Sequence, residues 1–215
     1  MRAIKLICLF AVTLASLPLR AQPVGPVSQP GTLATNRPPL YETEVKHVAG
    51  LDLIPTDFAY VTCGTNRFGF VLPAGYRLER EDPAKVTLVS ADFNCLLTFR
   101  VLESLPPGTT ELDPARYRDL ALSRRRGGKI LDESSQAAVN SRGPAFELRW
   151  NAAGAVPRRE RVVFIPSNAG VLEFDLVTSL ERFEAGQRAF HGLLRTFRAA
   201  QADGRLEMPV FSNRF

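Results

Sequence analysis

Histidine, cysteine and the signatures of catalysis are scarce in this sequence. Its 215 residues include two histidines and three cysteines, and neither His47 nor His191 has ligand spacing to a cysteine, so we expect no metal site. The motifs G-x-S-x-G, H-E-x-x-H and S-x-x-K, a phosphate-binding glycine loop and a paired-cysteine redox motif are absent. The sequence therefore predicts no cofactor and no catalytic centre. It leaves open a hydrolase built on two unpatterned carboxylates.

Long apolar runs are missing beyond the first residues of the chain. An apolar stretch from Leu6 to Leu17 follows two basic residues and leads into small residues. It is too short to span a bilayer comfortably, and the pattern is typical of a secretory signal peptide, 1–21, cleaved near Ala21. Cys8 lies at the start of the stretch, unlike the cysteine of a lipoprotein signal. We expect a periplasmic or extracellular protein without a transmembrane segment in the mature chain.

An excess of positive charge is missing once this segment is removed. The whole chain carries a net charge of +5, but three of its 27 basic residues and none of its 22 acidic residues lie in the signal segment. The mature chain is left at +2. Nucleic-acid binding therefore has no compositional support.

Two cysteines remain after export, Cys63 and Cys95. An oxidising compartment would allow one pairing between them, so they form a candidate disulfide. The alternative is a pair of buried thiols that pack as small apolar groups.

Composition and turn residues divide the rest of the chain into segments. Proline, glycine and small polar residues dominate the stretch after the signal, which predicts a flexible or polyproline-like linker. The segments are the linker 22–39, a short lead-in 40–65, the main domain 66–198 and a tail 199–215.

Extended runs dominate the main domain. Residues 68–72 and 76–80 surround a Pro-Ala-Gly bend, and two β-rich runs follow with the spacing of a hairpin. Two more alternating runs, and between them one run that is apolar on both faces and therefore expected as a central strand, complete an antiparallel pattern. These expected strands are 68–72, 76–80, 85–90, 94–103, 145–151, 161–166 and 170–179.

Two helices interrupt the strands. Asp113 and Pro114 form a helix start, and the first helix should run to Arg126. The second should run from Glu181 to Arg198, with an apolar stripe on one side and His191 on the solvent side. The stripe consists of Phe183, Phe190, Leu193, Leu194 and Phe197.

Charged residues at two places invite a functional interpretation. Arg124, Arg125 and Arg126 end the first helix, where cations offset the negative end of the helix dipole. The alternative is a binding surface for phosphate or for an acidic partner. Glu173 and Asp175 alternate with apolar residues, and we expect them to pair with Arg149 across a half-solvated face, and not to form a catalytic dyad.

The stretch "FVLPAGY" and the closing pattern "RRERVVFIPSNAGVLEFDLVTS", followed by a helix that ends in "FHGLLRTFR", resemble the PsbP-like proteins. These include photosystem II extrinsic subunits and DcrB-type bacterial lipoproteins. The resemblance covers residues 66–198. It implies an α+β fold, an antiparallel β-sheet flanked by helices, that serves as a binding or assembly module; no family site maps onto a residue here.

The function that fits these observations best is an exported, non-catalytic binding or assembly domain whose partner is another envelope or secreted protein. The alternative is a carrier or sensor of a small apolar ligand held between the sheet and the last helix. A carrier needs an internal cavity, whereas a protein binder needs an exposed apolar patch.

Overall fold

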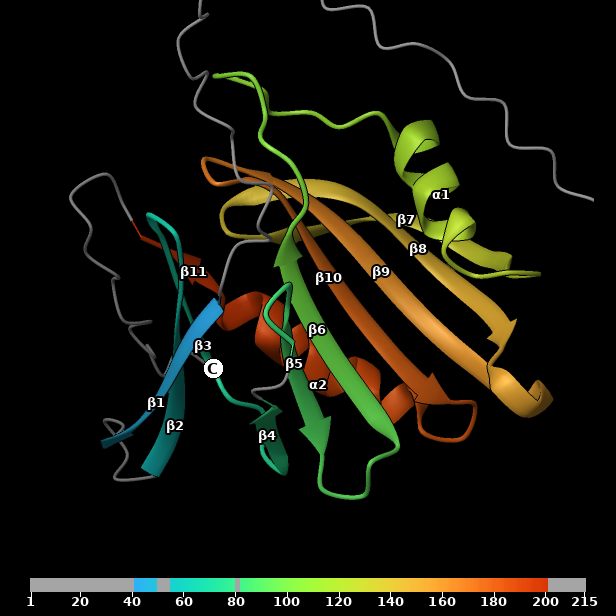
Figure 1. Cartoon of the computed structure of the whole chain (residues 1–215), viewed down its shortest axis with the longest axis horizontal. Coiled ribbons are helices and arrows are strands. Elements are labelled where there is room, and N and C mark those ends of the chain that lie inside the picture. The colour runs from blue at the N-terminus through green and yellow to red at the C-terminus, as the bar shows by residue number, and fades with distance from the viewer. Residues whose placement is uncertain (1–40, 50–54, 80–81, 201–215) are drawn as a thin grey trace, which may run out of the picture. The chain divides into compact units, whose positions relative to one another are not determined.

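The computed structural model describes residues 41–49, 55–79 and 82–200 (Figure 1). The expected signal peptide and linker, and the tail beyond residue 200, lie outside the described residues. The described residues form an α+β fold of antiparallel strands and two α-helices, so the expected fold class is confirmed.

A seven-stranded antiparallel sheet forms the centre of the fold. Its strand order is β4-β5-β6-β10-β9-β8-β7, so β10 crosses over to pair with β6. The three expected strands between residues 145 and 179 are present; the first two are longer than expected, and the third has the expected bounds. The strands are β4 (Tyr76–Glu79), β5 (Val86–Ser90), β6 (Cys95–Val101), β7 (Lys129–Ala138), β8 (Ser141–Asn151), β9 (Pro157–Ser167) and β10 (Gly170–Ser179), and a 3-10 helix, Ala153–Ala155, joins β8 to β9.

One helix lies on each face of this sheet: Figure 1 shows α1 (Pro114–Ser123) in front and α2 (Phe183–Thr196) behind. The Asp113 carboxylate accepts a hydrogen bond from the Ala115 amide at 3.0 Å, and Pro114 occupies the first turn, as expected. The helix ends at Ser123, three residues before the expected end. Tyr117 and Ala121 bury its apolar side against β8, β9 and β10.

The apolar stripe of α2 fills the space behind the sheet, which confirms the expected core face. Phe183, Phe190, Leu193, Leu194 and Phe197 are all at most 2% exposed. His191 is half-buried and not on the solvent side: its Nε2 atom is buried without a hydrogen-bond partner, and burial lowers the pKa of the imidazole.

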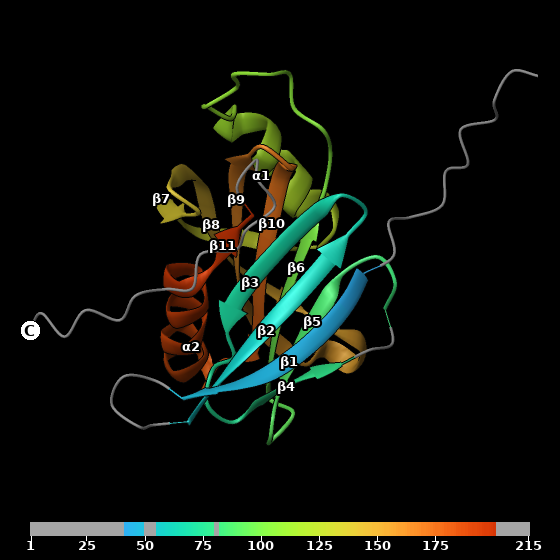
Figure 2. The ribbon, with the colours of Figure 1, turned by 90° about the vertical axis from the view of Figure 1, so that its left-hand side faces the viewer.

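A second sheet packs on the same side as α2 (Figure 2). Its order is β1-β2-β3-β11, all antiparallel. The lead-in supplies β1 (Tyr41–Ala49) and β2 (Pro55–Cys63), and β2 pairs with β3 (Asn66–Val71). The last residue of the expected main domain and the first of the tail form β11 (Arg198–Ala199). The lead-in is therefore a hairpin of the fold, because Ala59, Val61 and Cys63 bury their side chains in the shared core.

The Pro-Ala-Gly bend moves the chain from one sheet to the other. The Tyr76 amide donates to the Pro73 carbonyl at 3.0 Å, and Gly75 has a φ of 77°, where glycine is favoured. The runs before and after the bend were expected to open one antiparallel sheet, but β3 and β4 lie in different sheets.

Two glycines test how tightly the sheets are packed. A Cβ at Gly143 would lie 1.8 Å from the carbonyl oxygen of Phe164 on the neighbouring strand, whereas a Cβ at Gly192 on α2 would meet nothing within 4 Å. Gly143→Ala should lower the free energy of unfolding by about 3 kcal/mol. Gly192→Ala, the control, should raise it by about 0.5–1 kcal/mol. Urea unfolding measures both, and equal effects would contradict the register of β8 and β9.

Candidate functional site

Acidic side chains gather on the outer face of the seven-stranded sheet, the face that carries α1. The register places Glu173 beside Arg100 of β6 and Phe164 of β9, and Asp175 beside Thr98 and Val162. Glu160 pairs with Val177 and projects to the same face. Each of the three acids is at most 8% exposed. Buried carboxylates of this kind require charged or hydrogen-bonding partners.

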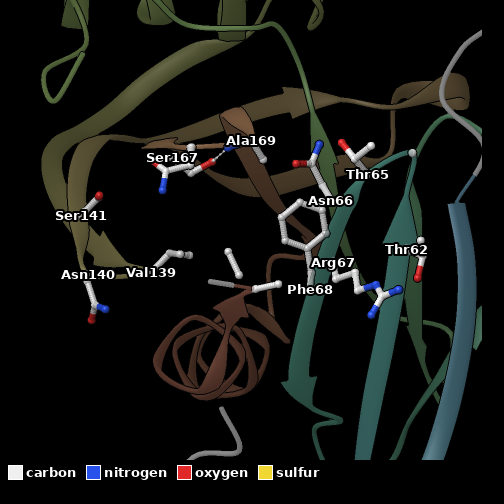
Figure 3. A pocket seen from close by; sticks show the side chains of 14 residues that line it. Thr62, Thr65, Asn66, Arg67, Phe68, Val139, Asn140, Ser141, Ser167 and Ala169 are labelled. Atoms are coloured by element: carbon white, nitrogen blue, oxygen red, sulfur yellow. Dashed lines mark hydrogen bonds between the residues drawn. The ribbon is translucent and has the colours of Figure 1, made fainter. Parts of the chain in front are cut away.

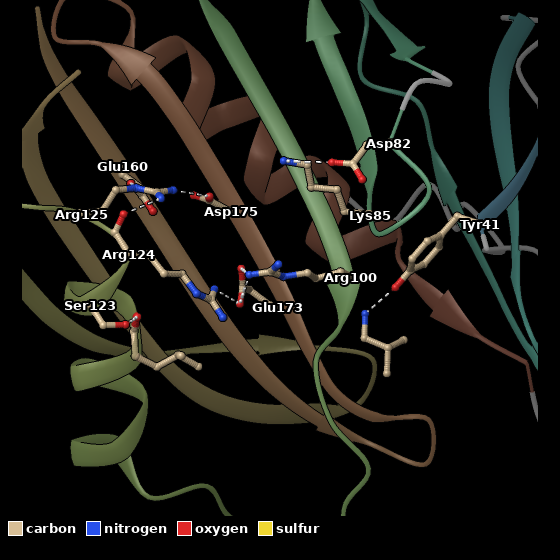
Figure 4. Close-up of polar contacts among 12 residues, drawn as sticks. Tyr41, Asp82, Lys85, Arg100, Ser123, Arg124, Arg125, Glu160, Glu173 and Asp175 are labelled. Carbon is tan, nitrogen blue, oxygen red and sulfur yellow. Dashed lines mark hydrogen bonds and ion pairs between the residues drawn. The ribbon is translucent and has the colours of Figure 1, made fainter. Parts of the chain in front are cut away.

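The chain that follows α1 supplies two of these partners (Figure 4). Arg124 pairs with Glu173, and Arg125 lies between Glu160 and Asp175, with its Nη2 atom 3.2 Å from Asp175 Oδ2. The interpretation that these arginines only offset the helix dipole is therefore wrong for Arg124 and Arg125, because their guanidinium groups neutralise buried acids. Arg126 is exposed.

The expected pairing of the acids with Arg149 is also wrong. Arg149 alternates with Leu148 and Trp150, and the register places Leu148 on the outer face with the acids. Arg149 therefore projects to the opposite face. Arg100 takes the expected place beside Glu173, with its Nη2 atom 3.0 Å from Glu173 Oε1.

These groups line a hollow of about 360 Å³, which we call the charged pocket. Its acids lie deepest: the side chains of Glu160, Glu173 and Asp175 are 4%, 7% and 11% exposed. Its cations lie above them, with side-chain exposures from 22% to 39%. The pocket is lined by Lys85, Thr98, Arg100, Ala121, Arg124, Arg125, Glu160, Val162, Glu173 and Asp175.

Two buried atoms of the charged pocket have no hydrogen-bond partner, Arg100 Nε and Asp175 Oδ1. Burial raises the pKa of Asp175 well above its usual range, and the nearby Glu160 carboxylate adds to the rise against the opposing effect of Arg125. Groups with perturbed pKa values in a hollow mark a candidate functional site.

The candidate disulfide does not form in the structure, where Cys63 and Cys95 are free, buried thiols. The Tyr41 hydroxyl forms a hydrogen bond with the Cys63 thiol and accepts another from the Val101 amide. Cys63 therefore lies near Val101, the last residue of β6. Cys95 is the first residue of β6, roughly 20 Å away at about 3.3 Å per residue. A disulfide needs Cα atoms within about 7 Å.

A second feature of the outer face is the turn between β5 and β6. Phe93 is 65% exposed and has a φ of 58°. The turn is held by a hydrogen bond from Ser90 Oγ to Asp92 Oδ1 at 2.6 Å, and Arg182 pairs with Asp92. The Phe93 ring lies over the Arg77 guanidinium, with 4.7 Å to the ring centroid.

Arg77 begins a row that crosses the sheet through Val89, Leu96 and Val177. Leu96 is 38% exposed. In Figure 1 this end of the sheet, at the β5–β6 turn, lies away from α1. We call Phe93, Leu96 and Val177 the apolar patch.

A polar hollow of about 1080 Å³ lies at the opposite end of the strands (Figure 3). Hairpin turns at Gly64, Val139 and Asn168 border it. None of the site residues expected from the sequence lies there, and its polar lining consists of amide and hydroxyl groups with one cation, Arg67.

The sequence interpretation named Glu173 and Asp175 but expected them on a half-solvated face, and it missed Glu160 and the apolar patch. The acids of β10 alternate as solvent-exposed residues do, and only the register with β6 and β9 shows that they are buried. Phe93 had a readable signal, since an aromatic residue occupied a hairpin turn where Asn, Asp or Gly is usual.

No family model matches the chain, and no curated protein matches it either. Among solved structures, the solution structure of cyanobacterial PsbP (CyanoP) from Synechocystis sp. PCC 6803 is similar, with 13% identity and a TM-score of 0.47 over 80% of this chain and 99% of that chain. The fold resembles that of PsbP. LpqN of Mycobacterium tuberculosis, which is involved in cell envelope biogenesis, is similar over 75% of this chain and 92% of its own, with 13% identity and a TM-score of 0.40.

Two further findings concern the described residues. Neither α1 nor α2 is long and apolar enough to cross a membrane. Within the ranges that the structure describes, no group of three or more His, Cys, Asp or Glu side chains is arranged to hold a metal ion.

Removing Arg125 should destabilise the protein, because Glu160 and Asp175 would stay buried without their shared cation. We expect Arg125→Gln to lower the free energy of unfolding by about 2 kcal/mol, less than for a fully buried pair because the guanidinium is partly solvated. Arg126→Gln, the matched control, should change it by less than about 0.5 kcal/mol. Guanidinium chloride unfolding measures both free energies. Equal losses in the two variants would contradict a special role for Arg125 and favour a shared role of the three arginines at the end of the helix.

The raised pKa of Asp175 should appear in the pH dependence of stability. The folded chain keeps this proton at pH values where the unfolded chain, with a pKa of about 3.9, has lost it. The free energy of unfolding should therefore fall as pH rises from about 4 towards the folded pKa. Asp175→Asn removes this loss, so the variant should gain stability relative to the natural chain as pH rises. Thermal unfolding at several pH values measures this. If the melting temperatures of Asp175→Asn and of the natural chain differ by the same amount at every pH, the raised pKa of Asp175 is contradicted.

Proposed function

We propose that the protein is an exported, non-catalytic binding module that docks another envelope or secreted protein through the apolar patch. The observation that carries the proposal is Phe93, a large aromatic side chain that is mostly exposed and held in a left-handed backbone conformation. The expected linker, 22–39, would give the domain reach towards such a partner.

The conformation of Phe93 has an energetic cost. A left-handed conformation costs a residue with a Cβ about 1–2 kcal/mol, and Asn or Gly adopts it more readily. The turn is nevertheless built to hold this position: the Phe93 amide donates to the Ser90 carbonyl at 2.9 Å, and the Asn94 amide donates to Asp92 Oδ1 at 3.2 Å. A strained aromatic side chain that buries little of its own surface is better explained by contact with a partner.

The surroundings of Phe93 have the composition of a protein interface. Aromatic and arginine side chains dominate the residues that contribute most to protein binding. Phe93 is stacked with Arg77, and Leu96 lies in the row of side chains that Arg77 begins. Arg182 lies beside the turn through its pair with Asp92. Protein interfaces commonly have an apolar centre and a polar or charged rim, and the surroundings of Phe93 have the same arrangement.

The carrier alternative has less support, because phenylalanine rings fill the centre of the space between the sheets and α2. A hollow of about 750 Å³ lies beside α2 at the Pro73–Gly75 bend, outside this cluster of rings. Phe197 contacts four other rings, with centroid distances between 4.8 and 5.8 Å. All five rings are at most 1% exposed. The five residues are Phe68, Phe70, Phe99, Phe174 and Phe197.

The hydrolase alternative has less support as well. Glu160, Glu173 and Asp175 lie together in the charged pocket, but each of these acids is paired with an arginine beneath the rim. A glycosidase needs two carboxyl groups that reach opposite sides of a sugar bond.

A photo-crosslinking amino acid at position 96, in the cells that export the protein, tests the proposal. A protein bound to the apolar patch should give one discrete crosslinked species. Phe93→Asn should abolish this species, while the melting temperature stays equal or rises because Asn fits the left-handed turn.

Position 131 is the matched control, since Leu131 is 52% exposed on β7, at the far edge of the same sheet. A crosslinker there should not give the same species. Identical products at positions 96 and 131, or a species that survives Phe93→Asn, would sink the proposal.

A further inference from the structure

We propose that the charged pocket is a binding site for a carboxylate, which enters between Lys85, Arg100 and Arg124. This site is separate from the apolar patch, and the proposal does not depend on protein docking there. Figure 4 shows Lys85 and Arg100 on one side of Glu173 and Arg124 on the other.

The first argument is that the pocket has more hydrogen-bond donors than its own acids use. A guanidinium group has five N–H donors. Arg100 uses only Nη2, on Glu173, and its Nε atom is buried without a partner. Arg124 pairs with the same carboxylate through Nη1. Two guanidinium groups therefore share one carboxylate and retain unused donors.

The second argument is the depth of the charges. The carboxylates lie at the bottom of the pocket, while the side chains of Arg124, Arg100 and Lys85 are 26%, 31% and 39% exposed. A ligand that enters from solvent therefore meets cations first. Lys85 has Asp82 as its partner at 3.5 Å, which leaves two of its three ammonium protons for a ligand.

The third argument is that Asp175 does not use the donors at the rim. Asp175 is 8% exposed, and its side chain is hydrogen-bonded to Glu160 and paired with Arg125. Thr98 lies beside Asp175 in the register and also lines the pocket. A carboxylate, with two acceptor oxygens, matches Arg100 Nε and the unused N–H groups of Arg124.

The volume of about 360 Å³ fits a small molecule or one side chain. A carboxylate has two possible sources, a free small acid or an acidic side chain of a bound protein. A cationic ligand would have to pass the three rim cations to reach the acids, so we expect no binding of amines.

Nuclear magnetic resonance of the exported chain, with ¹⁵N-labelled arginine, tests this site directly. The Nε–H signal of Arg100, assigned by its loss in Arg100→Lys, is followed during titration with glutarate and with a blocked tetraglutamate peptide. We expect a saturable shift with one or both. A shift with glutarate identifies a free acid as sufficient, and a shift with the peptide alone identifies the side chain of a protein.

Putrescine and a blocked tetralysine peptide are the matched probes of opposite charge. Lys85→Gln, at the solvated rim, should weaken carboxylate binding by roughly tenfold without unfolding the chain. Arg126→Gln and Phe93→Asn should leave it unchanged. The proposal is overturned if neither acid produces a saturable shift, if the amines bind more tightly than the acids, or if Lys85→Gln has no effect on affinity.

Discussion

The contact of Phe197 with both sheets is the constraint on which the rest of the structure depends. Its ring touches Phe68 and Phe70 of the four-stranded sheet, and Phe99 and Phe174 of the seven-stranded sheet. It lies directly after α2, so the same residue ends the helix and allows Arg198 and Ala199 to pair with β3. Aromatic rings at these distances fill the interior and stabilise it through area and geometry. The inner face of the large sheet is therefore fully used for folding, and the part of the outer face that α1 does not cover carries both proposed sites.

The outer face is only partly covered. Tyr117 and Ala121 of α1 pack on a group of apolar side chains from β8, β9 and β10. These are Phe146, Leu148, Val162, Phe164 and Val171. Between the part under α1 and the apolar patch lie Glu160, Glu173 and Asp175. Two arginines from the chain after α1 neutralise these acids, which keeps that connection against the sheet. Replacement of such a network by apolar residues is often neutral or stabilising, so stability alone does not explain why charge is buried here.

Local patterns predicted most of the elements and few of their pairings. The sequences of β8 and β10 follow a period of 2 and the stripe of α2 a period of 3.6, while β9 contains a continuous apolar run. The lead-in did not stand out, because Glu42, Glu44 and Lys46 of β1 are exposed and only its partner β2 is well buried. The sequence of the Pro73–Gly75 bend is compatible both with a hairpin within one sheet and with a connection between two sheets. Likewise, the spacing of Cys63 and Cys95 does not reveal that they lie near opposite ends of β6.

The two features that local patterns could not explain lie on the same face. At Phe93 a residue unsuited to its backbone conformation is kept, and at Asp175 an acid is kept where burial opposes its charge. Sequences generally satisfy local rules, and departures from them concentrate at sites where function requires the departure. The polar hollow at the other end of the strands also has a left-handed β-branched residue, Val139, but its side chain packs against the core. Strain at Val139 is therefore offset by burial within the chain, whereas the strain at Phe93 has no comparable compensation unless another molecule covers the ring.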